Sequence, residues 1–219
     1  NISAGTGVPV FATTVTRDAA FNGANKALAK GQLCYLSATD VTQQYNGASW
    51  ETVGPTAAPA SGLVLISTTT VGTAVASVTV SSCFSATYLN YKIWYNGGLS
   101  STDNDLALTI GSATANYNMV YVGAAYSANT FVGAGSANAA SFLYSGSTET
   151  VGGAYANIDL FNPFATANTR MFGGSAGTST AGYLGGILKD TTSHTGFTFT
   201  PGSGTLTGGT IRVYGYSLT

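Results

Sequence analysis

The stretch Leu106-Ala107-Leu108-Thr109-Ile110 alternates large apolar residues with smaller or more polar ones. Successive side chains of a β-strand point to opposite faces of the sheet, so a period of two indicates a strand. The pattern places Leu106, Leu108 and Ile110 on one face. It therefore predicts a strand with one buried side.

Similar stretches recur on both sides of this one and are separated by glycine-rich turns. The other expected strands cover residues 62–69, 75–80, 91–95, 118–122, 142–144, 157–161, 169–172, 196–200 and 210–216. Many short strands with regular turn spacing are typical of a β-sandwich or jelly roll. We therefore expect an all-β protein in which residues 62–219 form a jelly-roll-like β-sandwich.

Two segments of this domain are dominated by Gly, Ala and Ser. They cover residues 132–153 and 173–186. We expect them to be long loops or poorly defined strands, and to be the exposed tips of the domain.

A β-meander is expected at residues 31–53, ahead of the large domain. Asn46-Gly47 separates Tyr45 from Trp50, and both residues of this pair accept a positive φ. Such a pair between two short strand patterns predicts a hairpin.

Residues 55–61, which include Pro55 and Pro59, are expected to form a linker because prolines and small residues break the strand pattern. This linker separates an N-terminal attachment module, residues 1–54, from the large domain at residues 62–219.

A helical period is almost absent from the chain. The one candidate covers residues 17–30 (RDAAFNGANKALAK) and is interrupted by Asn22-Gly23. We expect a short helical turn there at most.

Charged residues make up only 7% of the chain, against roughly 25% in an average globular domain. Seven basic and eight acidic residues leave a net charge of −1. This argues against a nucleic-acid partner or an anionic membrane surface, since both require clustered Lys and Arg. No apolar stretch approaches the ~20 residues of a membrane-spanning helix, so no membrane insertion is expected.

Small neutral residues occupy the places that charges usually take. Two such surfaces can be buried together without removing water from ions. We interpret the composition as that of a chain that packs against copies of itself. A neutral exterior suited to conditions outside a cell is a compatible alternative. No signal-peptide pattern opens the chain, which begins without Met and leaves open what lies upstream of Asn1.

Cys34 and Cys83 are the only cysteines and His194 is the only histidine. We expect the cysteines to be buried small hydrophobes, with a disulfide left open. The three residues do not form a standard zinc site. His194 is expected to be a surface or turn histidine, because no GxSxG motif is present to supply a serine nucleophile.

Asp103 and Asp105 are a candidate carboxylate pair. A glycoside hydrolase needs two carboxyls roughly 5–9 Å apart beside the sugar, while a calcium loop needs a defined ligand spacing. We expect turn chemistry instead, since Asp and Asn side chains bond their own backbone. We therefore expect no enzymatic activity, cofactor or metal.

The chain contains thirteen tyrosines, several of which alternate along expected strands. Tyr91 alternates with Tyr95, and Tyr214 with Tyr216. A tyrosine at a subunit contact supplies a large flat area and one hydroxyl partner. Ordinary packing within a sheet explains the same pattern, and the sequence leaves both open.

Two stretches of the chain resemble structural proteins of tailed bacteriophages. The first, residues 11–54, is similar to a module of tail fibre and minor tail proteins. Its matching residues are Arg17-Asp18-Ala19-Ala20, Gly31, Tyr35-Leu36, Thr39-Asp40, Tyr45-Asn46-Gly47 and Trp50. The second resembles a phage particle domain, and it is carried by residues 62–66 (GLVLI), 84–91 (FSATYLNY), 158–163 (IDLFNP) and 196–216. The Gly208-Gly209 insertion departs from that pattern and indicates a longer turn.

This resemblance implies a non-enzymatic structural protein on the virion surface, in the form of a trimeric jelly roll. It implies a tail fibre or receptor-binding type of protein; capsid decoration is the alternative, and a polysaccharide-degrading tailspike is less favoured. The implied partners are two further copies of the chain, other virion proteins and a host surface glycan. The expected attachment residues are Arg17, Asp18, Tyr35, Tyr45 and Trp50. The expected exposed-loop or receptor contacts are Phe131, Phe142, Tyr144 and Tyr155.

Overall fold

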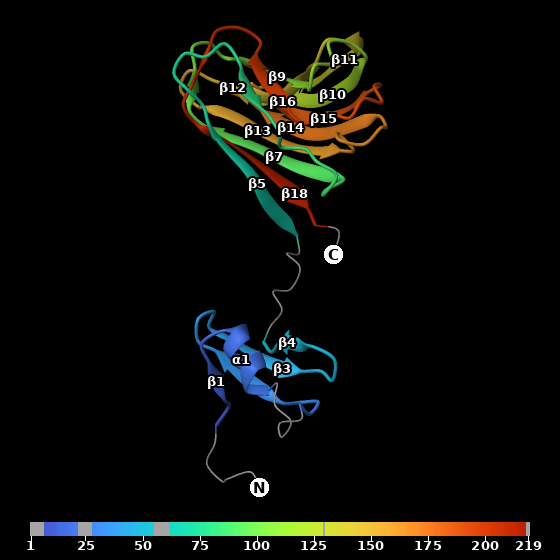
Figure 1. Cartoon of the computed structure of the whole chain (residues 1–219). Helices are drawn as coiled ribbons and strands as arrows, with labels where there is room; N and C mark the ends of the chain where they lie inside the picture. Colours follow the sequence, from blue (N-terminus) through green and yellow to red (C-terminus); the bar gives the residue numbers. More distant parts are fainter. Residues whose placement is uncertain (1–6, 22–27, 55–61, 129, 218–219) are drawn as a thin grey trace. The chain divides into compact units, whose positions relative to one another are not determined.

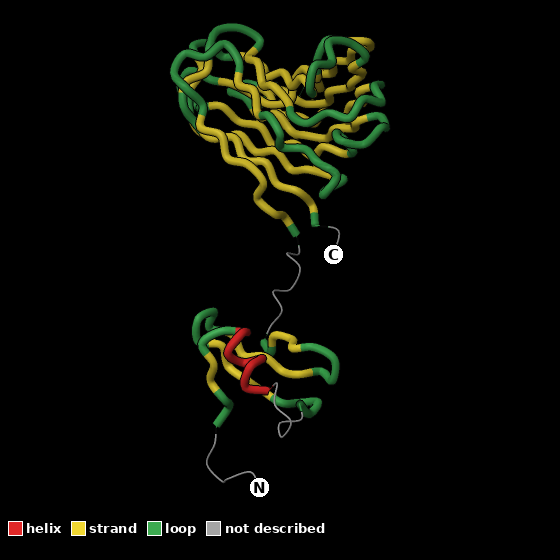
Figure 2. Tube along the Cα trace, viewed as in Figure 1, coloured by secondary structure: helices red, strands yellow, loops and turns green. Residues whose placement is uncertain are grey.

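The computed structural model describes residues 7–21, 28–54, 62–128 and 130–217. The chain divides into two compact units, Asn1–Pro59 and Ala60–Thr219. The expected linker at residues 55–61 lies outside the described residues. Strands dominate both units, with one short helix in the described part, so the expectation of an all-β protein is confirmed (Figure 2).

The first unit is a small four-stranded sheet with one helix on it (Figure 1). Its elements are β1 (Val10–Phe11), α1 (Thr14–Phe21), β2 (Leu33–Leu36), β3 (Val41–Tyr45) and β4 (Trp50–Thr52). Strands β2, β3 and β4 form the predicted antiparallel meander, and Tyr45 pairs with Trp50 across its hairpin. Strand β1 was not predicted, and it joins β2 in parallel.

The hairpin between β3 and β4 differs in one respect from its prediction. Gly47 has a positive φ of 106°, but Asn46 is absent from the positive-φ residues of the described chain. Its side-chain oxygen instead accepts the backbone N–H groups of Ala48 and Ser49, both at 2.8 Å. Asn46 therefore acts as a turn residue through its side chain.

The prediction of at most a helical turn within residues 17–30 is wrong, because α1 has eight residues and begins at Thr14. Its start is capped by Thr13, whose hydroxyl accepts the N–H of Thr16 at 3.3 Å. The Thr16 hydroxyl in turn accepts the N–H of Thr13 at 2.9 Å. This reciprocal cap satisfies N–H groups that a helix start leaves free. The Asn22-Gly23 pair lies outside the described residues.

The second unit contains fourteen strands in its described part. They are β5 (Leu63–Thr70), β6 (Val78–Val80), β7 (Asn90–Gly97), β8 (Leu99–Ser100), β9 (Asn104–Ile110), β10 (Tyr117–Ala125), β11 (Phe131–Ala139), β12 (Phe142–Thr148), β13 (Ala154–Phe161), β14 (Thr169–Ala176), β15 (Thr180–Leu188), β16 (Phe197–Pro201), β17 (Leu206–Thr207) and β18 (Thr210–Tyr216). All ten strands expected from alternation are present.

Eight strands form a large antiparallel sheet in the order β5-β18-β7-β13-β14-β15-β10-β11 (Figure 1). Four more, in the order β12-β9-β16-β6, form a second layer. The two layers are continuous where the start of β13 pairs with the end of β12. Strand β12 also contacts β10, β14 and β15, so the arrangement is sandwich-like.

The core lies between these layers. Leu106, Leu108 and Ile110 are fully buried, as their alternation predicts. Aromatic rings fill much of the remaining space, including Tyr91 and Phe197. Burial of such rings is the main source of stability in a unit of this size.

The glycine-rich segments 132–153 and 173–186 consist mostly of strands, so of the two structures expected for them the long loop is wrong. On the inner face, a Cβ on Gly186 would lie 2.7 Å from the Phe142 ring, and one on Gly182 would lie 2.6 Å from the Tyr121 ring. These glycines leave room for large rings from neighbouring strands. A strand can therefore contain glycines at inward positions where the ring of a residue on another strand fills the space.

Candidate binding face on the large sheet

The large sheet has one face against the core and one outer face. Lys92, Trp94 and Asn96 alternate with the buried Tyr91, Ile93 and Tyr95 on β7. Directly paired residues of antiparallel strands share a face. Trp94 pairs with Arg212 on β18 and with Asn157 on β13, so these residues belong to the outer face.

The outer face is unusually apolar. Its exposed large hydrophobic residues are Leu63, Leu65, Trp94, Val120, Val122, Phe131, Tyr155, Phe172 and Tyr183. They come from seven of the eight strands of the sheet. Contiguous apolar surfaces of this kind mark binding sites on soluble proteins.

One end of the outer face carries a continuous group that we call the apolar patch. It consists of Val120, Val122, Phe131, Phe172 and Tyr183, on strands β10, β11, β14 and β15. Phe131 is 84% exposed and Tyr183 is 80% exposed. Tyr183 lies opposite Gly174, and Phe172 lies opposite Gly185, so each ring covers a glycine of the neighbouring strand.

Beside the patch, over strands β18, β7 and β13, the outer face holds a pocket of about 310 Å³ that we call the Trp94 pocket. Its rings are Trp94, Tyr155 and Tyr214, from strands β7, β13 and β18. Trp94 and Tyr214 meet edge to face with ring centroids 5.1 Å apart. The polar groups of its lining are Asn96, Asn157 and Arg212.

A second pocket, of about 410 Å³, lies between the Trp94 pocket and the apolar patch. Its charges are paired: Lys92 Nζ donates to Asp159 Oδ2 at 3.0 Å. The hydroxyl of Tyr216 donates to the other carboxylate oxygen of Asp159. Burial and this carboxylate raise the pKa of Tyr216 to about 12, so its hydroxyl stays protonated at neutral pH.

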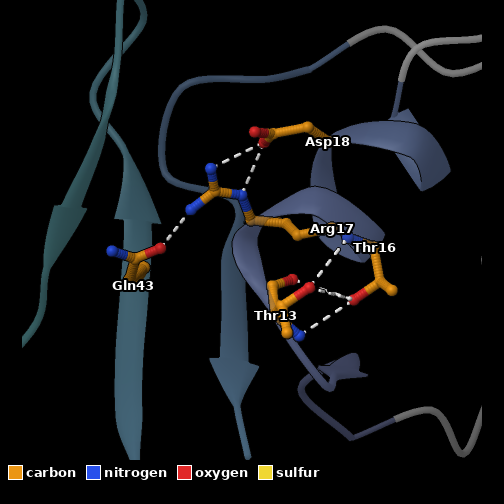
Figure 3. A network of polar contacts seen from close by, with 5 residues as sticks. All are labelled: Thr13, Thr16, Arg17, Asp18 and Gln43. Carbon is orange, nitrogen blue, oxygen red and sulfur yellow. Dashed lines mark hydrogen bonds and ion pairs between the residues drawn. The ribbon is translucent and has the colours of Figure 1, made fainter. Parts of the chain in front are cut away.

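The expected attachment residues of the first unit form two separate groups. Arg17 is buried on α1, and its Nε donates to Asp18 Oδ1 at 2.8 Å (Figure 3). Its Nη1 donates to the side-chain oxygen of Gln43 on β3, and its guanidinium lies 4.9 Å from the ring centroid of Trp50. Arg17, Asp18 and Trp50 therefore join the helix to the sheet.

Aromatic rings extend the cluster of Arg17, Asp18 and Trp50 along the sheet. Trp50 lies 5.4 Å from Phe21 and 5.6 Å from Tyr45 between ring centroids. Tyr35 is in the other group, where its hydroxyl donates to Asp40 and this hydrogen bond raises the pKa of the phenol. Tyr45 and Trp50 remain partly exposed beside this cluster.

The four expected receptor contacts are not brought together, and they lie on strands rather than loops. Phe142 is fully buried against Tyr117, so its expected exposure is wrong. Tyr144 is half-buried against Tyr121, with ring centroids 5.3 Å apart. Phe131 and Tyr155 are exposed on the outer face, but Phe131 lies on the edge strand β11 and Tyr155 on the central strand β13.

Three carboxylates line a further polar pocket of about 330 Å³, namely Asp103, Asp105 and Glu149. Asp103 accepts the backbone N–H of Thr150 at 2.7 Å, so it joins two loops distant in sequence instead of bonding its own turn as the sequence predicts. Burial raises the pKa of Asp105. Within the described residues, no group of three or more His, Cys, Asp or Glu side chains could hold a metal ion.

His194 is buried, which corrects the expectation of a surface histidine. Burial lowers its pKa, and the nearby Asp190 carboxylate opposes this effect only in part. Its Nε2 lies 3.4 Å from Asp190 Oδ2. The side chain packs against Gly111, where a Cβ would lie 2.4 Å from His194 Nδ1.

Both cysteines are buried, as predicted. They are free, which answers the question of a disulfide that the sequence leaves open, and they belong to different units. Burial raises the pKa of Cys34, and it raises that of Cys83 to about 12. A thiol with so high a pKa is a poor nucleophile at neutral pH.

Comparison with known proteins gives no assignment: no family model, no curated protein and no solved structure matches the chain. In the described part of the chain, no helix has the length and apolar character needed to cross a lipid bilayer.

Most of this face could not be recognised from sequence patterns. Trp94, Arg212, Phe172 and Tyr183 were not among the predicted site residues. Alternation along β7 was the available signal, since a buried Tyr91 and Tyr95 require an outward Trp94. The local sequence does not predict which strands lie beside β7.

Proposed function

We propose that the chain is a non-enzymatic structural protein on the surface of a tailed-phage virion, and that it assembles as a homotrimer through the apolar patch. In this proposal the second unit is a jelly-roll-like head of tail fibre or receptor-binding type. The observation that carries the proposal is the apolar patch. Burying its rings between protomers would remove a large apolar area from water.

The partner that best fits the patch is another copy of the chain. The five residues of the patch carry no charge, and Arg170 is the one charged residue in the hollow that Val120 and Phe172 line. Like-charge repulsion between identical protomers is therefore small there. Strand β11 is also an edge strand, and within the described residues it pairs only with β10. An open edge beside an apolar face favours contact between protomers.

The first unit is the proposed attachment module for other virion proteins. Its partly exposed Tyr45 and Trp50 are aromatic anchors of the kind found at protein interfaces. Capsid decoration remains the second candidate, because a neutral, sandwich-like head with an attachment module suits both locations. Quantitative mass spectrometry of the virion separates them: tens of copies indicate a tail, and hundreds indicate the head.

Light scattering coupled to size-exclusion chromatography tests the assembly. We expect the wild-type chain to have three times the monomer mass at micromolar concentration. The double change Phe172→Ser with Tyr183→Ser should yield monomers. Val151→Ser is the matched control, because Val151 is 90% exposed but lies outside the apolar patch.

A wild-type monomer under these conditions would overturn the assembly. An unchanged mass for the double variant would show that the apolar patch is not the contact between protomers. The non-enzymatic role has its own test, which is incubation with host capsule or cell-wall glycan. New reducing ends that disappear in Asp105→Asn would establish a tailspike instead.

A further inference from the structure

We propose that the Trp94 pocket binds a carboxylated sugar, such as a uronic or sialic acid residue of a host surface glycan. This inference deepens the receptor-binding role proposed above and rests on it. It concerns strands β18, β7 and β13, which lie beside the strands of the apolar patch in the same sheet. It is carried by three features of the pocket: its rings, its amides and its charge.

The rings give the pocket an apolar wall. Trp94, Tyr155 and Tyr214 come from three adjacent strands of a rigid sheet, so their spacing is fixed by strand pairing. Trp94 is 39% exposed and Tyr155 is 40% exposed, which leaves part of each ring free to contact a ligand. A pyranose presents C–H bonds on one face, and these pack well against an aromatic ring.

The amides give the pocket hydrogen-bond donors. Asn157 Oδ1 accepts from Trp94 Nε1 at 3.2 Å, and Asn96 Oδ1 accepts from Arg212 Nη1 at 3.5 Å. These bonds orient both amides by their oxygens. Among the described residues, neither amide NH2 group has a hydrogen-bond partner, so both can donate to sugar hydroxyls.

The charge gives the pocket its preference for an acid. Arg212 is the one charged residue among the pocket's lining residues, which include no carboxylate. Within the described residues Arg212 belongs to no ion pair, whereas Lys92 in the neighbouring pocket is paired with Asp159. A guanidinium binds a carboxylate through two parallel hydrogen bonds, and it does so more strongly than it binds a neutral hydroxyl.

Other occupants fit these features less well. A nucleic acid needs several phosphate contacts, and the pocket offers one cation. A neutral sugar would use the rings and amides but would supply no negative charge to pair with Arg212. The carboxylate is therefore the distinguishing group of the expected ligand.

The test is calorimetric titration of the full chain in low salt with oligosaccharides that contain glucuronic, galacturonic or sialic acid. Each is paired with the same oligosaccharide after reduction of its carboxylates to alcohols. We expect at least one acidic oligosaccharide to bind, and its reduced form to bind roughly tenfold more weakly or worse.

Two arginine variants locate the site. Arg212→Gln should weaken binding of the acidic oligosaccharide roughly tenfold or more, to the level of the reduced form. Arg170→Gln is the matched control, because Arg170 lies on the outer face of β14, outside the Trp94 pocket, and should leave the affinity within about twofold. Trp94→Ala should abolish binding of both forms.

Equal binding of the acidic and reduced forms would overturn the inference, as would unchanged affinity in Arg212→Gln. Failure of every acidic oligosaccharide to bind at millimolar concentration would also overturn it. Light scattering on the same samples keeps the two proposals apart. A trimer that binds no sugar contradicts only the sugar site, and a monomer that binds sugar contradicts only the assembly.

Discussion

Two pairs of glycines show how single residues shape the second unit. Gly97 and Gly98 join β7 to β8, and Gly208 and Gly209 join β17 to β18. All four have positive φ values, between 70° and 85°. At these glycines the β7–β18 strand pair gives way to the separate β8–β17 pair, so the two glycine pairs form a corner. The Gly208-Gly209 insertion noted in the sequence is part of this corner.

Gly98→Ala should therefore destabilise the second unit. A Cβ at this position would lie 2.2 Å from the Gly208 carbonyl oxygen. The left-handed backbone alone costs a non-glycine residue about 1–2 kcal/mol, and the clash adds to this. We expect the free energy of unfolding to fall by about 2 kcal/mol or more, measured by chemical denaturation with Trp94 fluorescence in a Trp50→Phe background.

Gly133→Ala is the control for this measurement. Gly133 lies within β11 without a positive φ, and the nearest atom to its Cβ would be 3.8 Å away. Its stability should change by less than about 0.5 kcal/mol, as at other unconstrained surface positions. Equal effects of the two substitutions would show that the corner imposes no special constraint.

At the scale of elements, one buried side chain holds α1 on its sheet. Arg17 contacts Asp18, Gln43 and Trp50, and its side chain is only 8% exposed. We predict that Arg17→Ala lowers the unfolding free energy of the first unit by about 2–3 kcal/mol, because hydrogen bonds to a charged group are lost in a buried position.

The measurement uses a Trp94→Phe background, in which Trp50 is the sole tryptophan and reports on the first unit. Val15→Ala provides the control, since Val15 lies on the same helix and is 74% exposed. Should Arg17→Ala and Val15→Ala unfold at the same denaturant concentration, the guanidinium would be a surface group of no structural consequence.

Alternation predicted the strands well because it reports a local property, the burial of one face. It failed for β15, where Gly182 and Gly186 leave space for the rings of Tyr121 and Phe142 from other strands. The bulk that identifies a strand was there supplied by residues distant in sequence. Helix α1 was missed for another reason: its cap is a Thr–Thr pair rather than the usual Thr–Glu pair.

The candidate site was predictable only in part. The outward position of Trp94 follows from its own strand, but the pocket also needs Arg212 from β18 and Tyr155 from β13. That neighbourhood depends on strand order, and strand order is set by contacts between residues far apart in the chain. Tyr155 was expected as a receptor contact; its partners in the pocket were not.

At the scale of the whole molecule, the low charge content and the apolar outer face are related. With charges at 7% of residues, few are available to surround the exposed rings. Among the described charges of the outer face, Lys92 and Asp159 are paired, Arg212 lines the Trp94 pocket, and Arg170 lies beside Val120 and Phe172 of the apolar patch. Assembly and ligand binding should therefore respond differently to salt.

We predict that self-association is nearly independent of ionic strength. Burial of apolar rings is not screened by salt, whereas an arginine–carboxylate contact at the surface is. Between 50 and 500 mM NaCl, the dissociation constant of the trimer should change less than about threefold, measured by sedimentation equilibrium over a dilution series. Ammonium sulfate should tighten the assembly, because excluded salts strengthen apolar burial. A dissociation constant that rises more than tenfold across the NaCl series would mean that ion pairs hold the protomers together. The apolar patch would then not be the contact between protomers.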